Sequence, residues 1–169
     1  MANDDKVRIL PYDRIYKNFI NQKYIPKGKD EYYLRNEQSV FSEEKWRHLR
    51  ADEIESLVNN KNVATNWDDV LVTDEFDPKM VKRNSFFGLV RIGRIKREVL
   101  EYHDLRVPVG ITDSSIVSCD IGDDVAIHNV HYLANYIIND RCILFNVNEI
   151  STTDHSKFGN GILKEGEDE

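Results

Sequence analysis

The residues best suited to chemistry in this chain are three histidines in its second half. His128 and His131 lie three positions apart, so a tight turn would bring both to one corner. An imidazole titrates near neutral pH and is suited to act as a general base on a hydroxyl or an amine. His103 begins the denser group His103-Asp104-Leu105-Arg106. Each histidine is therefore a candidate catalytic base, and the alternative is an exposed side chain on the outside of the fold.

A basic run accompanies these histidines in a chain whose net charge is −7. Residues 79–97 contain seven Lys or Arg and no acid. Such a run predicts either a solvated basic surface or an anion site for a phosphate, a nucleotide or a coenzyme A tail. Asp104 and Arg106 could orient a phosphate or carboxylate, or form a structural ion pair. The candidate ligand-binding residues are Arg91, Arg94, Asp104, Arg106, Asn129 and Asn135.

The composition narrows the class of protein. The chain has 169 residues, 40% hydrophobic and 31% charged, which is typical of one globular domain. The acidic balance argues against a nucleic-acid partner. Two cysteines, Cys119 and Cys142, make no disulfide framework, and no signal segment or membrane-length apolar run is evident. We predict a cytoplasmic protein without a membrane partner and without a metal site.

The elements that would position these residues change in character along the chain. Residues 1–46 are rich in aromatic side chains and predict an extension packed on the main body, with a short helix over 15–20 and a loop over 26–30. Residues 51–60 predict a helix, because apolar residues recur at positions 54, 57 and 58. Arg50 stands where a capping Ser or Thr is usual. Residues 69–73 predict a strand, and short strand-like pieces follow from residue 87.

An internal match identifies the expected architecture. Residues 121–130 match residues 138–147 at an offset of 17, and aliphatic residues recur every six positions at Ile121, Ile127 and Leu133. Three short strands joined by tight turns would form one triangular coil, which must stack on another coil to bury its faces. Gly or Asn at the corners tolerates the positive φ that such turns need. Asn129 should then stack on Asn146 between coils.

The fold class that follows is mostly β: a left-handed parallel β-helix of a few hexapeptide coils with an N-terminal α/β cap. The expected organisation is an N-terminal extension over 1–46, the cap over 47–84, the β-helix over 85–163, and an acidic tail or truncation point over 164–169. A helix of so few coils leaves its ends open, which predicts a homo-oligomer or additional coils.

Several motifs resemble a known family. They are Trp46-Arg47-His48-Leu49-Arg50-Ala51-Asp52-Glu53-Ile54, Asn66-Trp67-Asp68, Phe76-Asp77-Pro78, Phe87-Gly88-Leu89-Val90-Arg91-Ile92-Gly93, residues 103–110 and residues 158–162. Together they resemble a hexapeptide-repeat family of unknown function, similar to the β-helical part of sugar-1-phosphate nucleotidyltransferases and N-acetyltransferases. Members of that family are longer, and the resemblance covers residues 46–169. Arg50 departs from the Thr usual there.

The resemblance implies a transferase, either an acyltransferase or a partner of a nucleotide-sugar enzyme. Such an enzyme would use acetyl-CoA or a UDP-sugar, act on a sugar or nucleotide-sugar, and form a trimer like the enzymes it resembles. It predicts that His103, His128 or His131 lies in a cleft beside the basic run. Two alternatives remain: a non-catalytic β-helical scaffold, and an anion- or carbohydrate-binding module. The chain contains no P-loop, dinucleotide fingerprint or nucleophile elbow.

Overall fold

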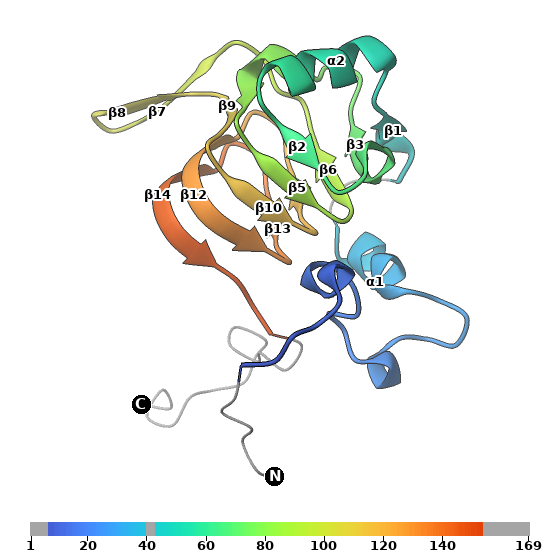
Figure 1. Ribbon diagram of the computed structural model, residues 1–169. Coiled ribbons are helices and arrows are strands. Elements are labelled where there is room, and N and C mark those ends of the chain that lie inside the picture. Colours follow the sequence, from blue (N-terminus) through green and yellow to red (C-terminus); the bar gives the residue numbers. More distant parts are fainter. Residues whose placement is uncertain (1–6, 40–42, 154–169) are drawn as a thin grey trace, which may run out of the picture.

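The computed structural model describes residues 7–39 and 43–153, and most of their regular structure is β-strand (Figure 1). The mostly β class is therefore confirmed. The helices are α1 (Glu31–Gln38) and α2 (Ala51–Asn59). The strands are β1 (Arg47–His48), β2 (Val63–Ala64), β3 (Val70–Val72), β4 (Val81–Lys82), β5 (Ser85–Phe87), β6 (Val90–Ile92), β7 (Val99–Tyr102), β8 (Leu105–Pro108), β9 (Gly110–Thr112), β10 (Ser115–Val117), β11 (Asp120–Ile121), β12 (Ala126–Ala134), β13 (Ile137–Ile138) and β14 (Ile143–Ile150).

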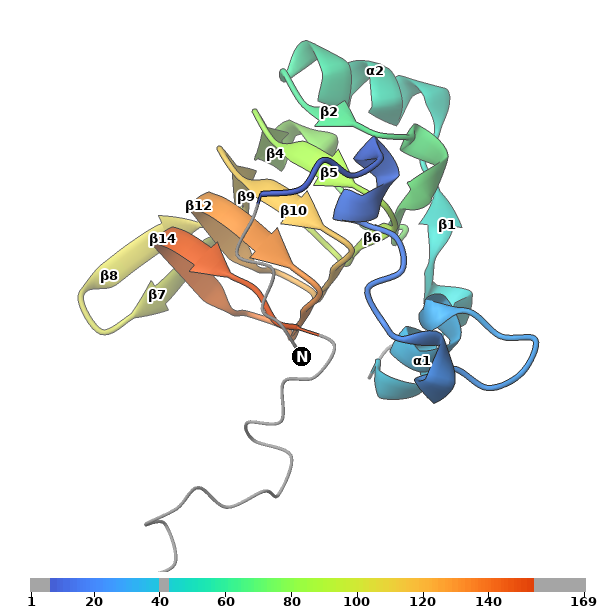
Figure 2. The same cartoon turned by 60° about the horizontal axis from the view of Figure 1, so that its bottom comes forward.

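Parallel pairing arranges most of these strands in three stacks. One stack is the sheet β3-β6-β11-β13, which β1 joins antiparallel at its edge. The second stack contains β4, β9 and the first halves of β12 and β14. The third contains β2, β5, β10 and the second half of β12, on which β14 continues. The chain visits the stacks in turn, so strands that neighbour each other in a stack belong to successive turns (Figure 2).

Each stack is held together by a column of inward-facing apolar side chains. Parallel register places Ile92 on Ile121 in the first stack, Ile111 on Ile127 in the second, and Ile116 on Leu133 in the third. All of these side chains are at most 1% exposed. The three residues at six-residue spacing, at positions 121, 127 and 133, fall one in each stack. Burial of such columns is the main stabilising contribution to the stacked strands.

The offset of 17 residues noted in the sequence is the register between the last two turns. Ile121 pairs with Ile138, Ile127 with Leu144, and Val130 with Val147. The preceding turn is longer, since β7 and β8 form an antiparallel hairpin that is inserted between β6 and β9 and projects from the stacks (Figure 1). The insertion stretches the offset between Arg91 and its partner Asp120 to 29 residues and hides the repeat there.

Single residues with positive φ turn the chain at the corners. Between the second and third stacks these residues are Arg83, Asp113, Asn129 and Asn146, with φ between 53° and 56°. The amide of Asn129 donates to that of Asn146 at 2.9 Å, so the predicted asparagine ladder is confirmed. A left-handed conformation costs a non-glycine residue roughly 1–2 kcal/mol. The fold therefore uses strained polar corners in place of glycines.

Close stacking explains two glycines at the corner between the first and second stacks. A Cβ on Gly93 would lie 2.4 Å from Asp123 Oδ1, and one on Gly122 would lie 2.6 Å from Asp140 Oδ1. In each case the carboxylate of the next turn accepts the backbone N–H that follows the glycine: Arg94 N–H at 2.8 Å and Asp123 N–H at 2.7 Å. The side chain of one turn thus caps the backbone of the turn before it.

Helix α2 matches the prediction over residues 51–60, and α2 covers one end of the stacks (Figure 1). Arg50 is its N-cap without a capping side-chain bond, and Glu53 compensates by accepting the Arg50 N–H at 2.8 Å. At the other end Lys61 has φ 66°, and the N–H groups of Lys61 and Asn62 bond the carbonyls of Val58 and Leu57. That pairing is the Schellman helix ending.

The N-terminal arm, residues 7–39, differs from its prediction. A 3₁₀ turn over Tyr12–Ile15 replaces the expected helix over 15–20, and α1 was not predicted. Helix α1 begins after Asp30, whose carboxylate accepts the Tyr33 N–H at 3.0 Å. It has no buried residue, so no apolar period marks it in the sequence. Capping and contacts with the stacks, rather than an apolar face, define this helix.

Candidate functional site

Four of the seven basic residues in the run of residues 79–97 form ion pairs with acids of the same chain. Arg83 donates two bonds to Asp113, at 2.6 and 2.8 Å. Arg91, 4% exposed, forms a two-pronged pair with Asp120, which is fully buried. These charges therefore serve contacts between turns, and a ligand at this surface would have to compete with them. The remaining pairs of the run are Arg94 with Asp124 and Glu75, and Lys96 with Glu75.

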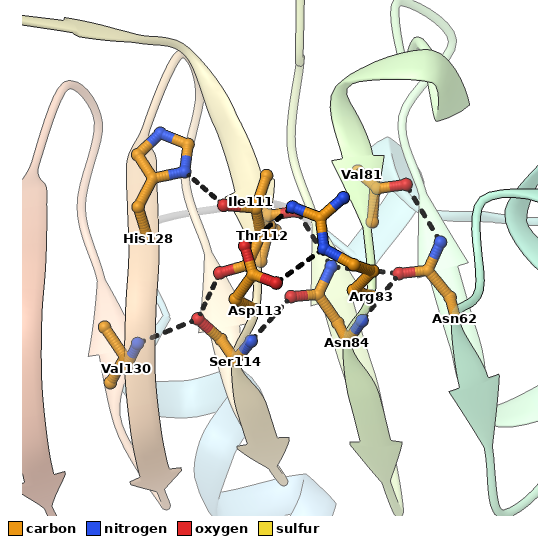
Figure 3. A network of polar contacts seen from close by, with 10 residues as sticks. All are labelled: Asn62, Val81, Arg83, Asn84, Ile111, Thr112, Asp113, Ser114, His128 and Val130. Carbon is orange, nitrogen blue, oxygen red and sulfur yellow. Dashed lines mark hydrogen bonds and ion pairs between the residues drawn. The ribbon is translucent and has the colours of Figure 1, made fainter.

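Both ring nitrogens of His128 are engaged inside the chain. Its Nε2 donates to the Pro108 carbonyl at 2.7 Å, because a carbonyl can only accept. In the neutral ring Nδ1 is then an acceptor, and the Thr112 hydroxyl lies 2.8 Å from it (Figure 3). The side chain is 8% exposed. His128 therefore joins β12 to β8 and β9, and its proton-accepting nitrogen is already occupied.

The other predicted site residues do not gather around His128. His103 lies at the tip of the β7–β8 hairpin with φ 52°, edge-on to Tyr102 at 4.3 Å between ring centroids. His131 is exposed on β12. Asp104 is exposed at the hairpin tip, and Arg106 pairs across the hairpin with Glu101. The structure thus distributes the three histidines over a corner, a hairpin tip and an outer strand face.

A buried polar network beside His128 escaped the sequence analysis. The Asn62 amide oxygen accepts from both the backbone and the side-chain N–H of Asn84, and Asn84 Oδ1 accepts the Ser114 N–H at 3.0 Å. The Ser114 hydroxyl in turn accepts the Val130 N–H at 3.1 Å (Figure 3). Asn62 and Asn84 are 22 positions apart, and Asn84 and Ser114 are 30 positions apart, because the turns differ in length. No constant sequence spacing therefore predicts this network. The network satisfies backbone groups at the corner and is structural.

A pocket lies where α1 meets the corner between the third and first stacks. Its open volume is about 480 Å³, mouth included. The arm closes one side with Phe19 and Ile20. Polar and aromatic side chains complete the lining: Glu31, Tyr32, Arg35 and Gln38 from the arm, and Asn135 and Tyr136 from the corner. Of the predicted site residues, only Asn135 lines it.

A buried ion cluster forms the base of this pocket. Arg35 Nε lies 3.3 Å from Asp120 Oδ1, and Arg35 Nη2 donates to the Leu89 carbonyl at 2.8 Å. Asp120 thus serves two guanidinium groups, those of Arg35 and Arg91. Burial lowers the pKa of Arg35, and the Asp120 carboxylate opposes that effect. Arginine stays charged even so, which makes the cluster a fixed electrostatic link between the arm and the stacks.

Within residues 7–39 and 43–153 no group of three or more His, Cys, Asp or Glu side chains could hold a metal ion. In the same ranges no helix has the length and apolarity needed to cross a membrane. Cys119 lies in the core and Cys142 packs against it, as expected from the sequence. The motif over 158–162 lies outside the described residues.

Comparison with known proteins places the chain in a family. Residues 46–167 match the model described as Domain of unknown function (DUF4954). A protein of Treponema pallidum (strain Nichols), described as uncharacterized, is 47% identical over 164 residues. The alignment covers 97% of this chain but only 23% of that relative. No solved structure matches. The chain therefore belongs to the DUF4954 family and corresponds to about a quarter of a longer relative.

Proposed function

We propose that this chain is a non-catalytic scaffold module, built as a left-handed parallel β-helix of the hexapeptide class, within a longer protein. The order in which the chain visits three parallel stacks supports this architecture. So does the aliphatic spacing of six, which assigns one residue to each stack. The similarity of one relative over 23% of its length supports a role as one part of a larger chain.

The observation that carries the proposal is that three of the groups a transferase would need free are engaged between turns, while the exposed His103 and His131 lie on a hairpin tip and an outer strand face. His128 has both ring nitrogens bonded, and Arg91 and Arg94 each bind a carboxylate of the next turn. A general base needs an unshared lone pair within reach of its substrate. Anion binding likewise needs charge that internal carboxylates have not neutralised. The same contacts are what a stacked scaffold requires.

The scaffold offers two surfaces for other parts of a protein. Strand β14 is eight residues long and, among residues 7–39 and 43–153, pairs only with β12. Its outer edge presents backbone groups to which a further strand could add. The β7–β8 hairpin projects from the stacks and exposes Val99, Tyr102 and Leu105. Such surfaces suit assembly, either with other segments of a longer chain or with copies in a trimer.

Ligand binding separates this proposal from the transferase hypothesis. We expect no concentration-dependent rise in melting temperature with acetyl-CoA or UDP-N-acetylglucosamine, because a ligand stabilises only a protein that binds it. A rise that grows with ligand concentration, and that a His103→Ala/His131→Ala variant loses, would overturn the scaffold proposal. Both histidines are exposed, so this variant should fold like the parent chain and serves as a fair test.

A further inference from the structure

The pocket between α1 and the Asn135 corner contains polar groups that the fold does not use. Within the described residues, the amides of Gln38 and Asn135 have no hydrogen-bond partner. Arg35 Nη2 donates to the Leu89 carbonyl, Nε lies 3.3 Å from Asp120 Oδ1 without a hydrogen bond, and no described group bonds Nη1. Glu31 accepts two backbone N–H groups of the arm through Oε2, which leaves Oε1 available. Donors and acceptors of different kinds thus converge on one small space.

Charge decides which ligand class suits these groups. Glu31 and Arg35 contribute one negative and one positive charge to the lining, and beneath them Asp120 balances Arg91. The site as a whole is neutral, so it has no excess charge with which to hold an anion such as phosphate. A neutral ligand that both donates and accepts hydrogen bonds matches an amide, carboxylate and guanidinium lining better.

Shape points to the same class. Tyr32 and Tyr136 contribute aromatic surface to the pocket, and Tyr136 is 37% exposed and so open to contact. The pocket encloses only about 80 Å³ and opens to solvent, so a ligand ring would rest on its lining and remain partly exposed. A sugar ring combines hydroxyl groups around its edge with C–H faces that pack on aromatic rings. We infer that this pocket binds a neutral sugar of monosaccharide size.

This inference is independent of the scaffold proposal, since a scaffold could carry such a site or lack it. Saturation-transfer NMR on the 169-residue chain would test it, with D-glucose, D-mannose and N-acetyl-D-glucosamine as probes. We expect transfer to the ring protons of at least one sugar, and no displacement of that sugar by inorganic phosphate. Absence of transfer from all three sugars, or displacement by phosphate, would overturn the inference.

Asn135→Gly is the most informative variant. Asn135 has φ 61°, a conformation that glycine adopts readily, so the change removes the amide without straining the corner. We expect the affinity for the sugar to fall about tenfold, as for one lost hydrogen bond. Asn129→Gly is the matched control, with φ 55° at a different corner, and should leave binding unchanged. Equal binding by the parent and Asn135→Gly would contradict the site, and Tyr136→Ala provides a second, independent check.

Discussion

The N-terminal arm and the three strand stacks are held in place by different forces. No side chain of residues 7–39 is buried, whereas the apolar core extends from Leu57 to Ile138. The arm contacts the stacks through separate polar and aromatic links, such as Arg35 with Asp120 and Tyr12 with Phe87 at 6.4 Å between ring centroids. The stacks should therefore unfold as one cooperative unit, while the arm opens at a lower free energy.

Charged side chains are also paired differently in the two regions. Inside the stacks, three basic residues of the run pair with acids of the next turn and Lys96 pairs with Glu75, so four of the seven cations are neutralised within the chain. Between arm and stacks, a single carboxylate, Asp120, serves two arginines. Exposed ion pairs contribute at most about 1 kcal/mol, but a buried charge that loses its partner is costly. Asp120 is thus the point where the two regions depend on each other.

The largest effect should follow from Asp120→Asn. The change leaves the buried Arg91 and the partly buried Arg35 beside a neutral group, which should lower the free energy of unfolding by about 3–5 kcal/mol. Urea denaturation followed by circular dichroism would measure it. Asp113→Asn is the control, because the Asp113–Arg83 pair is exposed and should contribute less than about 1 kcal/mol. Equal losses in the two variants would show that the buried cluster is not a special link.

A comparable effect should distinguish the core of the stacks from the arm. Ile127 is fully buried in the apolar column of the second stack, so Ile127→Ala should lower the free energy of unfolding by about 2–5 kcal/mol. Tyr12 is 72% exposed, and Tyr12→Ala should cost less than about 1 kcal/mol while increasing protease cleavage of the arm. A Tyr12→Ala loss as large as that of Ile127→Ala would mean that arm and stacks fold as one unit.

Acid should weaken the stacks through identifiable carboxylates. Burial raises the pKa of Glu53, but hydrogen bonds from Arg47 and the Arg50 N–H outweigh it, so the pKa lies below its usual value of 4.5. Burial also raises the pKa of Asp123, but hydrogen bonds from the Arg94 N–H and from Lys45 outweigh that effect. The pKa of Asp123 therefore also lies below its usual value. Groups with a lowered folded pKa stabilise the protein above their unfolded pKa and lose that contribution as the pH falls through the folded value.

Stability should therefore be steady from pH 7 to about pH 5 and should decline below about pH 4.5. Urea midpoints measured across this range would show the decline. Glu53→Gln should be less stable at neutral pH, since it leaves Arg47 with only the exposed carboxylate of Asp74, but its stability should depend less on pH. A variant with the parent's full acid dependence would exclude Glu53 as a contributor.

The smallest effect is a gain in stability at the end of α2. Lys61 occupies the left-handed position of the Schellman ending, where glycine is preferred, so Lys61→Gly should raise the free energy of unfolding by about 1 kcal/mol. Lys61→Ala keeps the strain but removes the charge, and should give no such gain. Thermal denaturation of the three proteins would compare them, and equal gains from both substitutions would attribute the effect to charge instead of backbone strain.

Local patterns in the sequence were enough for the regular parts of the fold. The spacing of apolar residues predicted α2, and the offset of 17 residues predicted the register of the last two turns. The offset also placed Asn129 on Asn146. Helix α1 could not be found in this way, since none of its residues is buried and no apolar period marks it. The candidate site was harder still: of the nine residues proposed from the sequence, only Asn135 lines the pocket beside α1.

By itself, the sequence determined that this protein is mostly β and that its strands recur at short, regular intervals, because side chains that repeat in the chain must repeat in the core. Only the tertiary structure decided what its charged and polar residues do. Arg91 binds Asp120 29 positions away, and His128 binds Pro108, the last residue of the inserted hairpin. Insertions change the number of residues in each turn but not the spacing between stacked strands, so partners that touch in space have no constant separation in the chain.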